Sequence, residues 1–195
     1  MGKSYLKKHK SFPKKLHLGC GDRIIKNFLN VDLQNSEINI DLTNRKLPFP
    51  NDTFEVIVSQ HVIEHLDLQH ELEPLFRELN RVLNDNGILY LSCPCIKKIC
   101  ESYIRDGGKT LVEGRKKRYP NWDLKGYPNV QMVNELFHQG IQHKNLFDYN
   151  LLSYSLHKCG FSSVKEIDEK FLLDKIHDLP PRRDEEQTLY VYATK

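Results

Sequence analysis

The sequence lacks the hydrophobic segments that membrane insertion or secretion requires. No run approaches the ~18 apolar residues of a membrane span. The first residues include lysine, serine and tyrosine instead of an apolar core followed by a small-residue cleavage site. We therefore expect a cytoplasmic protein without a membrane span. The five cysteines are odd in number and have no repeating spacing, which favours reduced thiols over a disulfide framework.

Acidic residues are absent from the first fifteen positions, which contain six lysines. The formal net charge of the chain is +3, so without these six lysines it is −3. This distribution argues against a globally basic surface for nucleic acid and leaves a basic tail, residues 1–13. The remaining residues, 14–195, are enough for one well-buried core, and we expect a single domain there.

The stretch from Leu16 to Asp22 predicts a buried strand that runs into a glycine turn. Gly19 and Gly21 let the backbone turn sharply and let a ligand approach its amides. A nicotinamide dinucleotide fits less well, because Ile24 replaces the third glycine of that fingerprint. The acid that should follow about 20 residues later is also too close, since Asp32 lies 11 residues after Gly21.

The rest of the chain predicts an α/β fold, a Rossmann-like, doubly wound and mostly parallel sheet with helices on its faces. Short apolar segments predict strands, and spacings of three and four predict helices. The expected strands cover 28–32, 38–41, 54–59, 88–92, 161–167 and 188–193, and the expected helices cover 69–83 and 147–159. Between them, residues 93–146 show no sustained period, and we interpret them as an inserted lid over the site.

Two carboxylates follow early strands of the predicted sheet. Ligands of open α/β sheets bind at the carboxyl ends of the strands, where the glycine turn, Asp32 and Asp41 would meet. One carboxylate can accept hydrogen bonds from both ribose hydroxyls, and a second can accept one from the amine of an adenine. Each acid also fits a helix cap or a turn former.

Together these motifs resemble those of class I S-adenosyl-L-methionine-dependent methyltransferases. They are most similar to the small type 11 enzymes often associated with glycan and cell-surface polysaccharide pathways. The resemblance covers most of the chain except residues 1–13 and the insertion. It is carried by Leu16–Asp22, Val31-Asp32, Asp41-Leu42, Leu47–Phe49 with Phe54–Leu66, and Arg81–Gly87. It implies the class I methyltransferase fold, S-adenosyl-L-methionine as the cofactor, and O-methylation of a sugar or glycan precursor.

The resemblance also implies the cofactor-binding residues. The methionine part would lie near Gly19, Cys20 and Gly21, the ribose near Asp32 and Leu33, the adenine near Asp41 and Leu42, and the methyl group near Ser59, Gln60 and His61. The chain departs from the family at His17, where an acid is common, and in its short first crossover. Part of the usual cofactor shell must therefore come from elsewhere.

An oxygen acceptor benefits from a general base. His143 is the first candidate, because the family often places a histidine just ahead of the helix near Phe147, and His61 is the second. A structural histidine is the alternative for both. Tyr119, Trp122, Tyr127 and Arg118 are the candidate acceptor-binding residues, since aromatics interleaved with charges suit a sugar face and its hydroxyls. The aromatics equally fit a small core inside the lid.

Two other functions compete with catalysis of methyl transfer. The first is a catalytically silent binding module that uses the basic tail to hold nucleic acid or an anionic partner. The second is a zinc hydrolase, because His61-x-x-Glu64-His65 matches the inverted zinc protease motif and places two histidines on one face of a helix. Cys93 and Cys95 with Cys100 form half of a zinc site at most. We expect no metal, and the sequence does not indicate an oligomeric state.

Overall fold

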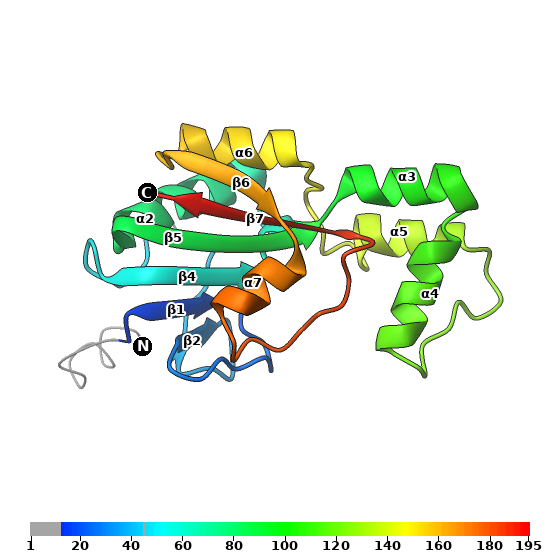
Figure 1. The fold of residues 1–195 in the computed structure, drawn as a ribbon, viewed down its shortest axis with the longest axis horizontal. Coiled ribbons are helices and arrows are strands. Elements are labelled where there is room, and N and C mark those ends of the chain that lie inside the picture. Colours follow the sequence, from blue (N-terminus) through cyan, green and yellow to red (C-terminus); the bar gives the residue numbers. More distant parts are fainter. Residues whose placement is uncertain (1–12, 45) are drawn as a thin grey trace.

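The computed structural model describes residues 13–44 and 46–195, so nearly all of the predicted basic tail lies outside the described residues. A seven-stranded sheet forms the centre, in the order β3-β2-β1-β4-β5-β7-β6 (Figure 1). Its strands are β1 (Lys15–Leu18), β2 (Leu29–Asp32), β3 (Ile38–Asn39), β4 (Phe54–Gln60), β5 (Leu83–Pro94), β6 (Ser163–Ile167) and β7 (Thr188–Thr194). Only β7 runs antiparallel to its neighbours, which confirms the mostly parallel sheet.

Helices cover both faces of the sheet, as a doubly wound fold requires (Figure 1). On one face, α2 (Glu73–Val82) and α6 (Tyr149–Lys158) pack in the main core, together with Leu16 and Leu18 of β1. On the other face, α7 (Glu169–Lys175) packs through Leu172 against β4, β5 and β7. None of the helices in the described part of the chain has the length and apolar character needed to cross a membrane.

The first crossover, between β1 and β2, contains no helix, as its length predicts. The buried Asn30 side chain holds it in place. Its amide nitrogen donates to the carbonyl oxygens of Ile25 and Phe28, both at 3.0 Å, and its oxygen accepts from the Ile25 amide at 3.0 Å. A side chain of β2 thus supplies the backbone partners that a crossover helix would otherwise provide.

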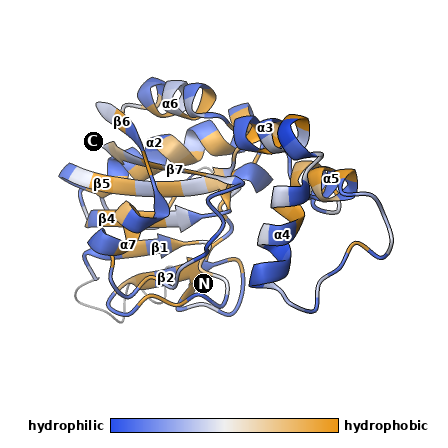
Figure 2. Cartoon of the chain, turned by 45° about the vertical axis from the view of Figure 1, so that its right-hand side comes forward, coloured by the Kyte–Doolittle hydropathy of each residue, from blue (hydrophilic) through white to orange (hydrophobic). Residues whose placement is uncertain are grey.

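The segment from 93 to 146 is more regular than its sequence indicates. It forms α3 (Ile96–Asp106), α4 (Lys109–Arg118) and α5 (Val130–His138) beyond the carboxyl ends of β4 and β5 (Figure 1). These helices pack on one another around a small separate core, so their apolar residues gather where they meet (Figure 2). This core consists of Ile99, Leu111, Val112, Met132 and Leu136. With so few apolar positions in each helix, no sustained period arises.

Three further boundaries differ from prediction. Helix α7 was not predicted; it has only seven residues and begins where the Asp168 carboxylate accepts the Phe171 amide. The predicted helix 69–83 begins as a π-helical turn, Leu68–Leu72, and continues as α2. Strand β5 starts at Leu83 instead of residue 88, because Leu83 already pairs with Phe54.

Candidate functional site

The glycine turn lies directly after β1, and the space around the missing side chain differs between Gly19 and Gly21. Both have left-handed backbone angles, with φ of +66° at Gly19 and +52° at Gly21. A Cβ at Gly19 would lie 2.1 Å from Cγ2 of Val62, and 3.2 Å from both Cβ and Cγ1 of the same residue. A Cβ at Gly21 would have no atom of the described residues within 4 Å. Gly19 therefore permits close packing, whereas Gly21 borders open space.

Asp32 ties the glycine turn to the end of β2. Its Oδ2 accepts the Gly21 amide at 2.7 Å, and its Oδ1 accepts the Leu33 amide at 2.6 Å. The carboxylate is partly exposed, so it keeps lone pairs for a ligand. The structure thus brings Gly19, Cys20, Gly21 and Asp32 together at adjacent strand ends.

Asp41 has the turn-forming contacts that the sequence left as an alternative. Its Oδ1 accepts the Thr43 amide at 2.9 Å and the Thr43 hydroxyl at 2.7 Å, and the residue is exposed. Leu42 packs against the main core, while Leu33 is exposed. The cysteine of the turn is buried, and this burial raises the pKa of the Cys20 thiol to about 11, so it remains protonated near neutral pH.

A cleft of about 990 Å³ opens between the glycine turn and helices α4 and α5. The glycine turn, the end of β4 and the loop before β7 form one part of its wall, and the helices and the segment after α5 form the other. The lining residues include Gly19, Cys20, Gly21, Gln60, His61, His65, Arg115, Arg118, Tyr119, Glu135, His143, Arg182 and Asp184. Ser59 is buried and does not line the cleft, whereas both polar atoms of the Gln60 side chain lack a hydrogen-bond partner within the described chain.

His61 lies between two buried carboxylates. Its Nε2 is 3.3 Å from Oδ2 of Asp184, and its Nδ1 is 3.4 Å from Oε1 of Glu64. Burial lowers the pKa of His61, but the contacts with Asp184 and Glu64 outweigh burial and raise it above its usual value. The geometry therefore favours an imidazolium that neutralises two acids.

Asp184 was not identified from the sequence, where it simply follows a proline- and arginine-rich loop. Its carboxylate accepts the Tyr190 hydroxyl at 2.5 Å and Nε of Arg182 at 2.9 Å. Burial alone would raise the pKa of Asp184. The contacts with His61 and Arg182 outweigh this effect and hold the pKa well below its usual range. The loop before β7 thus supplies the main counter-charge of His61.

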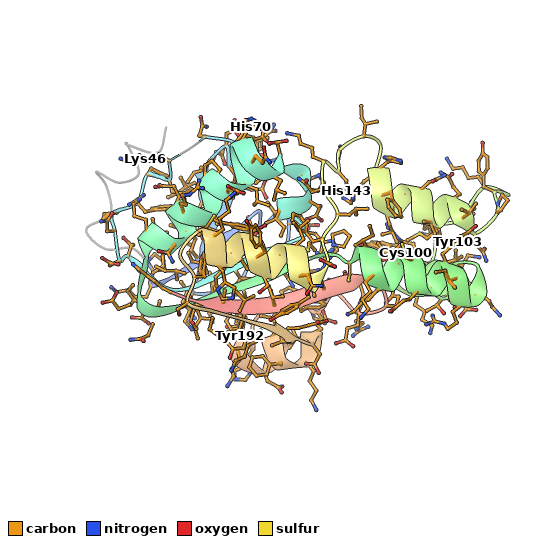
Figure 3. All side chains as sticks on the ribbon, turned by 90° about the horizontal axis from the view of Figure 1, so that it is seen from above. Lys46, His70, Cys100, Tyr103, His143 and Tyr192 are labelled. Carbon is orange, nitrogen blue, oxygen red and sulfur yellow. The ribbon has the colours of Figure 1, made fainter. Side chains whose placement is uncertain are left out.

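Glu64, His65 and His143 form a group that we call the Glu64 cluster. One ligand-type atom from each residue lies within 4.8 Å of the others. Glu64 and His65 belong to the short 3₁₀ turn η1 (Ile63–His65), and His143 lies in the segment between α5 and α6 (Figure 3). The expectation that His61 and His65 share a helical face is wrong, because His61 precedes η1 with φ of +56°.

The hydrogen bonds of the two histidines fix which nitrogens remain free. Nδ1 of His143 is 2.8 Å from the Leu136 carbonyl oxygen, and Nδ1 of His65 is 3.3 Å from the Gln142 carbonyl oxygen. Because a carbonyl accepts, each Nδ1 carries the proton and each Nε2 keeps a lone pair. Burial lowers the pKa of His143, which keeps this imidazole neutral.

The predicted acceptor residues divide between two pockets. Arg118 and Tyr119 line the cleft, but Trp122 and Tyr127 line a separate pocket of about 470 Å³. Trp122 also packs against the small core of the lid, as the alternative interpretation expects. Arg118 is paired with Glu186 and donates to the Gln187 side-chain oxygen at 3.1 Å, so its charge is already compensated.

His17, which replaces an acid common in the family, does not face the cleft. It is buried, and its Nδ1 lies 3.3 Å from Oδ1 of Asn30. Burial lowers the pKa of His17 to about 4. This residue therefore belongs to the support of the first crossover.

Comparisons with known proteins agree with this geometry. Residues 16–91 match the family model of the type 11 methyltransferase domain. A search of curated protein sequences gave no match. The fold is similar to that of a SAM-dependent methyltransferase from Archaeoglobus fulgidus, with a TM-score of 0.54 and 15% identity over 99% of this chain and 90% of that chain. It is also similar to a SAM-dependent methyltransferase from Mesorhizobium loti, with a TM-score of 0.52 and 16% identity over 95% and 92%.

The matched residues include the glycine turn, Asp32, Glu64 and His65. They end before α3, α4 and α5, and before His143. The strand order, with an antiparallel β7, is the one typical of class I methyltransferases. The chain therefore has the class I methyltransferase fold, and its residues 16–91 match the model of the type 11 methyltransferase domain.

Proposed function

We propose that the chain is an S-adenosyl-L-methionine-dependent methyltransferase that acts on a hydroxyl oxygen of a small sugar or glycan precursor bound in the cleft. The observation that carries the proposal is the cleft itself, because the glycine turn and His143 both line it. Its volume of about 990 Å³ is at the upper end for small-molecule sites, enough for a cofactor portion and an acceptor. A cytoplasmic location, which the sequence predicts, remains part of this proposal.

The residues present fit the cofactor. Gly21 leaves open space where a side chain would stand, and the partly exposed Asp32 carboxylate has lone pairs for two ribose hydroxyls. When bound, S-adenosyl-L-methionine supplies a methyl group already activated on a sulfonium. Cys20, Leu33, Asp41, Leu42, Ser59, Gln60 and His61 remain predicted neighbours of the cofactor. The exposed turn at Asp41 makes its contribution the weakest of the set.

His143 is the candidate for the group that faces the acceptor hydroxyl. Its Nδ1–H donates a hydrogen bond to the Leu136 carbonyl oxygen, so Nε2 carries the lone pair of the ring. Nε2 has no hydrogen-bond partner among the described residues. A positioned base contributes about 10²- to 10⁴-fold to a proton transfer. His61 is less suited, because both of its nitrogens already face carboxylates.

The acceptor side of the cleft is polar and contains a planar ring. Tyr119 is exposed in the lining and lies with Arg115 and Glu135. Such a combination suits the face and the hydroxyls of a sugar. Trp122 and Tyr127 can contact only an acceptor long enough to pass Glu135, which lines both pockets.

The test begins with calorimetric titration of S-adenosyl-L-methionine and S-adenosylhomocysteine into the purified protein. Asp32→Ala should weaken binding by about 1.5 to 3 kcal/mol, the value of hydrogen bonds to a charged group. Asp178→Ala, at an exposed position away from the cleft, is the matched control. Acceptors are then screened by formation of S-adenosylhomocysteine with free sugars and nucleotide sugars, and with amines as the competing class. Turnover of amines alone would contradict the O-methyl transfer.

A further inference from the structure

We propose that the Glu64 cluster binds a divalent transition-metal ion at the wall of the cleft. Its three side chains, Glu64, His65 and His143, offer a carboxylate and two imidazoles within 4.8 Å of one another. Two histidines and one carboxylate form a common ligand set of catalytic zinc and non-haem metal sites. His65 and His143 line the cleft, so the cluster lies at its wall.

The strongest support for this site is the burial of the Glu64 carboxylate. The residue is only 1% exposed, and the contact of its carboxylate with His61 is at the long limit of a hydrogen bond. Its nearest charged neighbour is Nδ1 of His61 at 3.4 Å. A buried carboxylate is costly unless it is paired and hydrogen-bonded, and His61 is shared with Asp184. Oε1 of Glu64 faces both His61 and His143, and the carboxylate keeps lone pairs that can bind a cation.

His143 adds a second lone pair aimed at the same place. Its Nε2 lies 4.0 Å from Oε1 of Glu64, is buried, and has no hydrogen-bond partner among the residues described. With Nδ1 donating to Leu136, this nitrogen is an acceptor that faces another acceptor. Two facing acceptors repel, and a cation between them turns this repulsion into attraction.

His65 completes the set, and its position is fixed from outside the cluster. The rings of His65 and His143 meet edge to face, with centroids 4.9 Å apart. Both histidines use Nδ1 for a backbone carbonyl, which is the outer contact that usually orients a metal-ligating imidazole. The orientation of both rings is thus set without the ion.

The ligand chemistry selects the class of cation. Imidazoles suit zinc and the neighbouring first-row metals, whereas magnesium and calcium prefer oxygen ligands. In a tetrahedral site, ligand atoms about 2.1 Å from the ion lie about 3.4 Å from one another. Nε2 of His143 and Oε1 of Glu64, now 4.0 Å apart, would therefore approach by about half an ångström, and a pair at the 4.8 Å limit by about 1.4 Å.

This inference rests on the proposed function and changes the role of one residue in it. An ion held by Glu64, His65 and His143 would lower the pKa of an acceptor hydroxyl that reached it, and the O–H proton would pass to solvent water. The oxygen would then form its bond to the methyl carbon while the sulfur–carbon bond broke and sulfur kept the electron pair. His143 acts as a ligand through Nε2 and no longer as the base.

The test is metal binding by tag-free protein that has been treated with a chelator and dialysed. Zn²⁺, Mn²⁺ and Mg²⁺ are titrated by calorimetry, and Co²⁺ is added to record its visible absorption bands. We expect one site per chain that prefers Zn²⁺ or Mn²⁺ over Mg²⁺. His65→Ala and His143→Ala should each weaken it at least 10-fold, since loss of even an outer-shell partner costs that much.

His177→Ala is the matched control, because His177 is exposed and lies outside the cluster. It should leave metal affinity and melting temperature unchanged. Glu64→Gln, which keeps the shape but removes the charge, should weaken binding even if one histidine variant fails to fold. Absence of a site in folded wild-type protein, or equal affinity in all variants, would overturn the inference.

Cofactor titration separates the two proposals. Binding of S-adenosyl-L-methionine and turnover of an acceptor by metal-free protein, at a rate that added Zn²⁺ or Mn²⁺ does not change, would leave the proposed function intact and overturn the role of the ion in the reaction. A metal site in a protein that turns over no hydroxyl acceptor would contradict the proposed function instead.

Discussion

Substitution by alanine should have different effects at the two glycines of the turn after β1. We expect the larger loss of stability at Gly19 and the larger loss of cofactor affinity at Gly21. Gly21→Ala places a methyl group in open space, so its stability cost is the left-handed backbone strain of about 1–2 kcal/mol. Gly19→Ala has the same strain plus an overlap with Val62 at 2.1 Å. Cγ2 of Val62 would overlap the new atom, and Cβ and Cγ1 would each be in tight contact with it at 3.2 Å, so Val62 must change its rotamer or shift. Overpacking of this kind adds about 1–3 kcal/mol.

Cofactor affinity should show the reverse order. The space in front of Gly21 is part of the cleft in which we place the cofactor, so Gly21→Ala should reduce affinity at least 10-fold in a protein that remains folded. The free energy of unfolding is measured with urea and the affinity by calorimetry. In a Val62→Ala background, the extra cost at Gly19 should fall by about 1 kcal/mol or more, because two of the overlapping carbons are gone. Equal stability costs at Gly19 and Gly21, unchanged by Val62→Ala, would refute this reasoning.

Three further changes test the support of the site. His17 has a folded-state pKa of about 4 and an ordinary value of 6.5, so the unfolded chain binds its proton first. The contribution of His17 to the free energy of unfolding should therefore fall by about 2 kcal/mol between pH 7 and pH 5. Urea unfolding at the two pH values should show a smaller fall for His17→Gln than for the wild type, and an equal fall in both proteins would contradict the lowered pKa of His17. Asn30→Ala leaves the backbone groups of the crossover without partners and should cost about 3 kcal/mol or more, where a loss below 1 would contradict its role. Asp184→Asn breaks a buried ion pair and should cost about 3 kcal/mol in the same assay, with a fall in the pKa of His61 observable by NMR titration.

The parts of the fold that were predicted from the sequence are those with local physical causes. Strand β4 combines apolar and β-branched residues, β1 and β2 have buried leucines or valine, and the short first crossover follows from the residue count. Helices α3, α4 and α5 were not predicted, because each contributes only a few apolar residues to a core that they build together. No single window of sequence carries that pattern.

The same distinction separates the parts of the site. The glycine turn and Asp32 were predicted because neighbouring parallel strands bring their carboxyl ends together. Asp184 and His143 reach the cleft from the loop before β7 and from the segment after α5. Their meeting with Glu64 and His61 depends on packing between distant segments. His143 was named only through the family resemblance, and Asp184 was missed because the local sequence around it has no signal of this contact.

The charges at the centre of the site divide the histidines into two kinds. His61 is between Glu64 and Asp184, and its raised pKa means that it carries the positive charge that two buried acids need. His143 has a carbonyl on one nitrogen and no partner among the described residues on the other, and its lowered pKa keeps that lone pair free. A buried imidazolium has no lone pair with which to accept a proton or bind a metal, whereas a neutral imidazole can do either. Of these two histidines, His143 is therefore the one that can act as the base or the metal ligand that we propose, and His61 is the one that balances the buried acids.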